Sequence, residues 1–243
     1  MDAPQGNSIL WLIQYAVRHS VSLVITLLVL SAVYGFNVLK SSNYSPIQTV
    51  RIVGANHLDK AEVRETLGSL VTRGFFSVDV ERIRDRLEQL PWVSATTVRR
   101  VWPDGIEVIL KEKEVLARWN KESLLSTDGD LFTPRESSYP SSVAEFSGPD
   151  GQQISMLKYF ININRILQPL HAKISYLELT SYLTWMLRLD NGLMLKMGHD
   201  DVLTRMTHFV KVYPKIVGER VADVDYVDLR YSNGMAIKWK NAG

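Results

Sequence analysis

An uncharged apolar stretch near the N-terminus is the feature that most constrains this chain of 243 residues. Twenty consecutive residues, Ser20 to Leu39, carry no charge and are bounded by His19 and Lys40. A helix of roughly 20 mainly apolar residues is long enough to cross the hydrocarbon core of a bilayer. We therefore expect a tail over residues 1–19, one transmembrane helix over residues 20–39, and all later residues on one side of a membrane.

A cleaved signal peptide is the alternative interpretation of this stretch. Apolar regions of signal peptides run about 7 to 15 residues and end at a cleavage site of small residues. The stretch here is longer, and the segment from Gly35 to Val38 is a poor cleavage context. The sequence therefore favours an uncleaved anchor.

The charges that flank the helix leave its orientation open. Asp2 and Arg18 precede it, while Lys40 and Arg51 follow it. Because long domains translocate largely regardless of charge, the short tail and the 204 residues after position 39 favour an N-terminus inside the cytoplasm and a bulk outside it. The absence of cysteine excludes disulfides and thiolate metal sites, and it is compatible with an oxidising compartment.

Basic and acidic residues nearly balance after the anchor, at 27 against 25. This balance argues against nucleic acid as a partner. Arg82, Arg84 and Arg86 alternate with other residues on a helical pattern, so we interpret them as a solvated helix face.

Residues 45–114 have the pattern of a small domain with the element order β-α-α-β-β. Asp59 and Asp79 stand at the positions of helix N-caps, which predicts helices to about Leu67 and to Leu90, before Pro91. Alternating apolar residues predict strands over residues 49–53, 93–101 and 106–111.

Residues 115–243 are rich in predicted strands and contain two predicted helices. The dipeptides Asp128–Gly129 and Asn191–Gly192 predict hairpins. Apolar periodicity predicts one helix over about 152–170 and another from near Asp200 to Pro214. Residues 137–150, rich in Ser, Pro and Gly, predict a surface loop.

The fold class is therefore α+β. It combines a single N-terminal transmembrane helix, a β-α-α-β-β domain and a mixed β-domain with two helices. The last two strands of the β-domain are expected over residues 223–231 and 235–240.

Short motifs in both blocks are similar to those of one protein family. In the first block they are Gly74 to Asp79, Leu90 to Val93 and Arg99 to Pro103, and Ala117 to Trp119 follows just after that block. In the second block they are Val227 to Tyr231 and Gly234 to Trp239. In this order they resemble the POTRA domain and the β-domain of the FtsQ/DivIB family of bacterial cell-division proteins, in its Gram-negative FtsQ form. Val115 stands where that family usually has a proline, a departure that concerns a linker bend.

The resemblance implies a non-enzymatic scaffold of the division machinery, a single-pass type II protein of the inner membrane at the division septum. It implies docking of the periplasmic parts of FtsB and FtsL, contacts with other division proteins such as FtsK, FtsW and FtsI, and no cofactor. By resemblance, Arg230 and Tyr231 would contact the partner, and Val98 and Arg100 are weaker candidates in the POTRA domain. An arginine suits such a role because it can pair with a carboxylate in a bidentate manner.

The last predicted strand points to binding by a sheet edge. Its outer edge has no later strand in this sequence to cover it, and exposed edges recruit partners by β-augmentation. The candidate partner-binding residues here are Gly234, Met235, Ile237 and Trp239. The alternative is that the apolar residues are ordinary core and that an earlier segment covers the edge.

One motif offers an enzymatic alternative. Ser155 and Lys158 have the S-x-x-K spacing of penicillin-binding acyl enzymes. The supporting motifs are incomplete, because Lys196 is not followed by the hydroxyl residue of K-T-G and Ser232–Asn233 lacks the end of S-D-N. Ser155 is also expected on a solvent-facing side of its helix. We therefore expect no catalytic residue; a POTRA-bearing chaperone or secretion component is the other alternative function.

Metal binding is not expected either. His199 and His208 are nine residues apart, which would place them on opposite faces of a helix. Asp128 and Asp130 could suggest calcium, but a calcium loop needs about six to eight oxygen ligands, and no further acid recurs at alternate positions.

Overall fold

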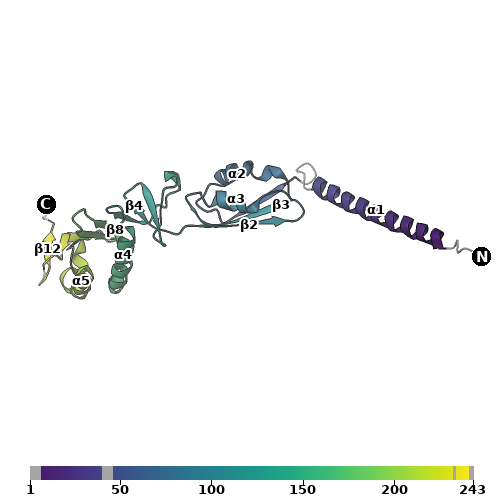
Figure 1. The fold of residues 1–243 in the computed structure, drawn as a ribbon. Helices are drawn as coiled ribbons and strands as arrows, with labels where there is room; N and C mark the ends of the chain where they lie inside the picture. The colour runs from purple at the N-terminus through teal and green to yellow at the C-terminus, as the bar shows by residue number, and fades with distance from the viewer. Residues whose placement is uncertain (1–6, 40–45, 232–233, 241–243) are drawn as a thin grey trace, which may run out of the picture. The chain divides into compact units, whose positions relative to one another are not determined.

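The computed structural model describes residues 7–39, 46–231 and 234–240 (Figure 1). Its first element is the helix α1 (Asn7–Leu39), of 33 residues. Within α1, Val17–Val38 is long and apolar enough to cross a membrane, judged by length and composition. The stretch predicted as an anchor is thus the second half of a longer helix.

A three-stranded sheet with two helices follows, in the predicted order β-α-α-β-β. The strands are β1 (Thr49–Val53), β2 (Val93–Val101) and β3 (Gly105–Glu112), and β3 lies between the other two. The helices are α2 (Lys60–Gly68) and α3 (Val80–Leu87), with the short 3-10 helix η1 (Val71–Arg73) between them.

Local capping explains where the two helices begin. The Asp59 carboxylate accepts a hydrogen bond from the backbone N–H of Ala61 at 2.8 Å, and Asp79 accepts one from Arg82 at 3.0 Å. Each bond satisfies one of the backbone donors that the first turn of a helix leaves without a partner. Both predicted N-caps are therefore confirmed.

The residues after position 114 build a nine-stranded mixed sheet with the strand order β12-β11-β10-β9-β8-β7-β4-β5-β6. In chain order the strands are β4 (Val115–Trp119), β5 (Ser123–Ser126), β6 (Leu131–Phe132), β7 (Ala144–Ser147), β8 (Ile174–Leu179), β9 (Trp185–Leu189), β10 (Met194–Gly198), β11 (Val224–Asp228) and β12 (Ala236–Trp239). The helices are α4 (Gln153–Leu167) and α5 (Val202–Ile216), with the short 3-10 helices η2 (Glu136–Ser138), η3 (Gln168–Leu170) and η4 (Gly218–Asp223).

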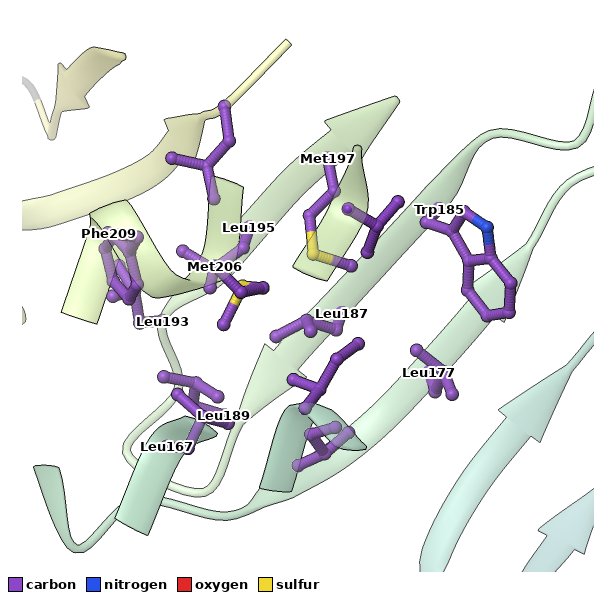
Figure 2. Packing of buried hydrophobic residues seen from close by; sticks show 14 of the residues in the cluster. Leu167, Leu177, Trp185, Leu187, Leu189, Leu193, Leu195, Met197, Met206 and Phe209 are labelled. Atoms are coloured by element: carbon purple, nitrogen blue, oxygen red, sulfur yellow. The ribbon is translucent and has the colours of Figure 1, made fainter. Parts of the chain in front are cut away.

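One hydrophobic core joins the two longer helices to this sheet. Figure 2 shows Leu167 of α4 and Met206 and Phe209 of α5 beside the side chains of the sheet. Alternate residues along the strands, such as Leu187 and Leu195, are fully buried in the same cluster. Because the helices use one face of the sheet, the opposite side chains of the strands are the more exposed ones.

Both predicted hairpins are present, and one prediction for this block is wrong. β5 pairs with β6 and β9 pairs with β10, both antiparallel. Residues 137–150 are not a surface loop throughout, because Ala144–Ser147 form β7, which pairs in parallel with β4 and β8. Phe146 of this strand is 1% exposed. Four residues flanked by Ser and Pro show no periodicity, so only the neighbouring strands identify this one.

Contacts between residues divide the chain into two compact units. The chain passes from one unit to the other more than once. Residues 56–58 and 90–94 group with the residues from Glu112 onward. The Glu112 carboxylate accepts hydrogen bonds from the backbone N–H groups of Asn56, His57 and Leu58 at 2.7, 2.9 and 2.9 Å. The same carboxylate lies 2.9 Å from Nδ1 of the His57 ring, which stacks on Trp92 with 4.7 Å between ring centres. Glu112 therefore holds together segments more than 50 positions apart.

Candidate partner-binding surface

β12 forms one end of the nine-stranded sheet. It pairs antiparallel with β11, with Ile237 opposite Val227, and among the described residues no strand pairs with its other side. The backbone N–H of Lys240 donates to Asp223 at 2.7 Å. Because backbone groups alternate in direction along a strand, Ile237 and Trp239 direct theirs away from β11. The edge therefore offers hydrogen-bonding groups to an added strand.

Three of the candidate residues at this edge have side chains that face the core of the β-domain. Met235, Ile237 and Trp239 are partly buried and pack against the core of the β-domain. The Arg220 guanidinium lies 4.2 Å from the centre of the Trp239 ring. Their packing matches the alternative in which they are core residues, while the strand itself remains at the edge. What the edge presents to a partner is therefore its backbone.

Arg230 is held by an acid of its own chain. Its guanidinium makes a bidentate contact with Asp228, with Nε to Oδ1 at 2.9 Å and Nη2 to Oδ2 at 2.6 Å. Only 7% of the Asp228 side chain is exposed, against 56% of the Arg230 side chain. The hydrogen bond from Arg230 lowers the pKa of Asp228 and outweighs burial, which would raise it. The two residues stand two positions apart in one motif, so their opposite charges are a signal of this pair in the sequence.

Tyr231 follows this pair and is 59% exposed. An aromatic side chain that is free of the core is the kind of residue that contributes strongly to interfaces. Gly234, the remaining candidate, is exposed two positions before the start of β12.

Two lysines that were not among the sequence-based candidates also lie near the edge. Lys196 of β10 lies with Nζ 3.7 Å from the centre of the Tyr226 ring, on β11. Lys238 of β12 lies 5.6 Å from the same ring and 3.4 Å from the Asp225 carboxylate. In the strand pairing, Tyr226 is opposite both Met194 and Lys238. The position of these residues on the sheet face without helices follows only from strand register.

The candidates of the three-stranded sheet lie on β2, which is an edge strand. Val98 is partly buried. Arg100 donates from Nε to the backbone oxygen of Phe75 at 3.1 Å and from Nη2 to that of Val78 at 2.6 Å. Arg100 therefore ties β2 to the loop that leads into α3, and a contact with a partner stays a prediction for both residues.

The residues considered for catalysis and metal binding lie in ordinary settings. A solvent-facing position was expected for Ser155, but its side chain is partly buried. It lines a hollow of about 400 Å³ together with Tyr159 and Trp185. Lys158 is exposed. The segment from Asp128 to Asp130 forms the hairpin turn, with Gly129 at a φ of 92°. Glycine adopts such a conformation without a steric penalty.

Comparisons with known proteins agree with this architecture. Residues 45–113 match the model of the FtsQ-type POTRA domain, and residues 117–230 match that of the C-terminal part of the cell division protein FtsQ/DivIB. The chain is 34% identical over 212 residues to the cell division protein FtsQ of Coxiella burnetii, covering 87% of each protein. It is 31% identical over 229 residues to the FtsQ of Vibrio cholerae, covering 93% of this chain and 88% of that one.

A third relative extends this agreement to another organism. The FtsQ of Burkholderia pseudomallei is 31% identical over 197 residues, or 79% of each protein. The matched segments contain the three-stranded sheet, most of the nine-stranded sheet and their helices in the order described above, while β12 lies beyond residue 230. The chain therefore belongs to the FtsQ/DivIB family of bacterial cell division proteins.

Proposed function

We propose that this protein is a single-pass scaffold of the inner membrane that docks the periplasmic parts of FtsB and FtsL at the division septum. In this proposal α1 is the anchor, residues 45–114 are the POTRA domain, and residues 115–243 are the β-domain that receives the partner. The observation that carries the proposal is the edge position of β12 in the nine-stranded sheet. The protein would act by binding and not by catalysis.

The partner would add a strand to β12. An extended segment of FtsB would bond to the backbone groups of Ile237 and Trp239, which point away from β11. Tyr231 would supply an exposed aromatic contact beside that strand. The exposed part of Arg230, together with Lys196 and Lys238, would favour acidic residues in the partner.

The POTRA domain would serve other division proteins, such as FtsK, FtsW and FtsI. Its sheet ends in the edge strand β2, which carries Val98 and Arg100. The cytoplasmic tail and the helix over residues 20–39 would hold both domains at the periplasmic side of the membrane.

Amide hydrogen exchange tests the docking mode directly. In the free protein the amides of Ile237 and Trp239 should exchange fast, whereas those of Ala236 and Lys238 should exchange slowly because they face β11. A peptide with the extracytoplasmic sequence of the host FtsB should slow the first pair and leave the second pair unchanged. The measurement is residue-resolved exchange on the full-length protein in lipid nanodiscs.

The alternation of fast and slow amide exchange along β12 is the internal control of this experiment. A partner that packs on the sheet face would slow neighbouring amides without regard to their direction. If the peptide binds but the amides of Ile237 and Trp239 exchange as fast as before, β-augmentation at β12 is wrong.

A second prediction concerns Tyr231. The change Tyr231→Ala should weaken binding of the FtsB peptide by about tenfold or more, because hot-spot aromatics commonly contribute about 2 kcal/mol. The melting temperature should stay unchanged, since the side chain lies outside the core. Isothermal calorimetry and thermal unfolding are the measurements. Tyr182→Ala, which removes an exposed tyrosine between β8 and β9, is the matched control and should bind normally; equal affinities for the two variants would remove Tyr231 from the interface.

A further inference from the structure

The turn between β2 and β3 exposes a run of apolar side chains. Trp102 is 80% exposed and Val101 is 45% exposed, and Pro103 comes next in the chain. A tryptophan has one of the largest apolar surfaces of any side chain, and its indole N–H favours a place where one end is apolar and the other is wet. A membrane–water interface is such a place.

Backbone hydrogen bonds fix this turn to the start of the POTRA domain. The N–H groups of Gln48 and Thr49 donate to the carbonyl oxygen of Asp104 at 3.0 and 3.5 Å. The turn therefore lies beside the point at which the chain enters the domain. β1 runs away from this point. The opposite end of the sheet is therefore separated from α1 by more residues than the end with the turn.

The length of the connection keeps the turn close to the membrane. Gln48 follows Leu39, the last residue of α1, by nine positions. Nine residues span at most about 30 Å even when fully extended. If α1 crosses the bilayer, the Trp102 turn is within reach of the interface at the C-terminal end of the helix.

Charges near the turn suit lipid headgroups. Arg51 and Arg99 both pair with Glu107, so two guanidinium groups share one carboxylate. The two arginine side chains are 72% and 64% exposed, which leaves them free to meet phosphate oxygens as well. Asp104 is the one acid of the turn itself, and it is partly buried.

The C-terminal end of α1 carries residues of the kind that lie at a membrane–water interface. Tyr34 and Phe36 are exposed in the last two turns of the helix. Aromatic residues at this position form the belt that sits at headgroup level. The aromatic turn and the aromatic helix end would then occupy one layer.

We propose that the Trp102 turn, Val101 to Pro103, inserts into the headgroup region of the bilayer and holds the POTRA domain against the membrane surface. The partner is the lipid surface, which would be recognised by the exposed indole of Trp102 and by the guanidinium groups of Arg51 and Arg99. A second point of attachment would restrict rotation of the domain about its anchor, so β2 would face division proteins in a defined orientation. This inference rests on the proposed anchoring by α1.

Site-directed spin labelling tests the proposal, since the chain has no cysteine that would compete for the label. A nitroxide is attached to Val101→Cys in the full-length protein, reconstituted in vesicles of phosphatidylcholine and phosphatidylglycerol. Its accessibility to oxygen, relative to a water-soluble nickel complex, reports depth in the bilayer. Labels at Val29→Cys, within α1, and at Tyr182→Cys, exposed in the β-domain, give the lipid and water references.

The label at position 101 should shift from the water reference toward the lipid reference. Adding Trp102→Glu should return it to the water value, whereas Trp102→Tyr should retain the shift. The far-UV circular dichroism and the melting temperature should be unchanged in both variants because the side chain lies outside the core.

Two results would overturn the inference while leaving the proposed anchoring intact. If the label at position 101 matches the label at position 182 while the label at position 29 is in lipid, the turn is in water and the anchoring stands. If Trp102→Glu leaves the label immersed, Trp102 does not attach the domain. A water-exposed label at position 29 would instead refute the anchoring and the inference together.

Discussion

Replacing Arg230 by glutamate is expected to lower both the stability of the β-domain and its affinity for FtsB. Asp228 is 7% exposed and would lose its bidentate partner while gaining a like charge beside it. The exposed part of the guanidinium would no longer attract an acid of the partner, and the affinity should fall by more than about tenfold. Thermal unfolding and calorimetry with the FtsB peptide measure the two effects.

The intramolecular pair changes how this experiment must be controlled. From the sequence one would expect Arg230→Glu to leave the melting temperature unchanged, and the pairing with Asp228 argues against that. Asp228→Asn removes the acid and keeps the arginine, and adding Arg230→Gln then isolates the contact with the partner. Arg188→Glu makes the same change of charge at an exposed position of β9 and should bind normally.

The comparison of Asp228→Asn with the double variant decides the role of Arg230. If Arg230 contacts FtsB, the double variant should bind clearly more weakly than Asp228→Asn. Equal affinity for the two would show that Arg230 acts only by holding Asp228 and the start of the β11–β12 connection.

The second large effect is expected at Glu112. Glu112→Ala should lower the free energy of unfolding by about 2–3 kcal/mol, because the backbone donors of Asn56, His57 and Leu58 lose their common acceptor. Glu112→Gln should cost less, since one acceptor oxygen remains. Chemical denaturation of the full-length protein measures both, and Glu114→Gln, two positions away and exposed, is the matched control.

The Glu112 interaction should also depend on pH. Burial would raise the pKa of Glu112, but the hydrogen bonds from the Leu58 backbone, the His57 ring and the neighbouring backbone groups outweigh it and lower the pKa below its ordinary 4.5. The stabilisation is therefore present above about pH 4.5 and is lost as the pH falls through the folded-state pKa. Unfolding curves of wild type and Glu112→Gln should converge at acidic pH, and a constant difference between them would contradict this account.

Local chemistry explains the elements that could be predicted from the sequence. The caps at Asp59 and Asp79 and the hairpins at Asp128–Gly129 and Asn191–Gly192 depend on residues within a few positions of each other. The apolar length of α1 is likewise a property of one continuous stretch. The edge position of the last strand was also anticipated.

The errors arose where a residue's role depends on distant partners. β7 is a strand because β4 and β8 flank it, although its own four residues show no pattern. In α5, Phe209 is fully buried, and Leu203 and Val210 pack against the same core with part of their surface exposed. Ser155 is partly buried and lines a hollow together with Leu179 of β8 and Trp185 of β9.

The apolar helix, the β-α-α-β-β order, the hairpins and the family resemblance could all be read from the amino-acid sequence, because each rests on short-range periodicity, capping or motif order. Three relations became visible only in the folded protein: Arg230 is bound to Asp228, Glu112 accepts hydrogen bonds from three backbone donors more than 50 positions away, and the Trp102 turn lies beside the entry of the chain into its domain. These relations depend on strand register and on packing between separated segments, and neither leaves a local pattern in the chain.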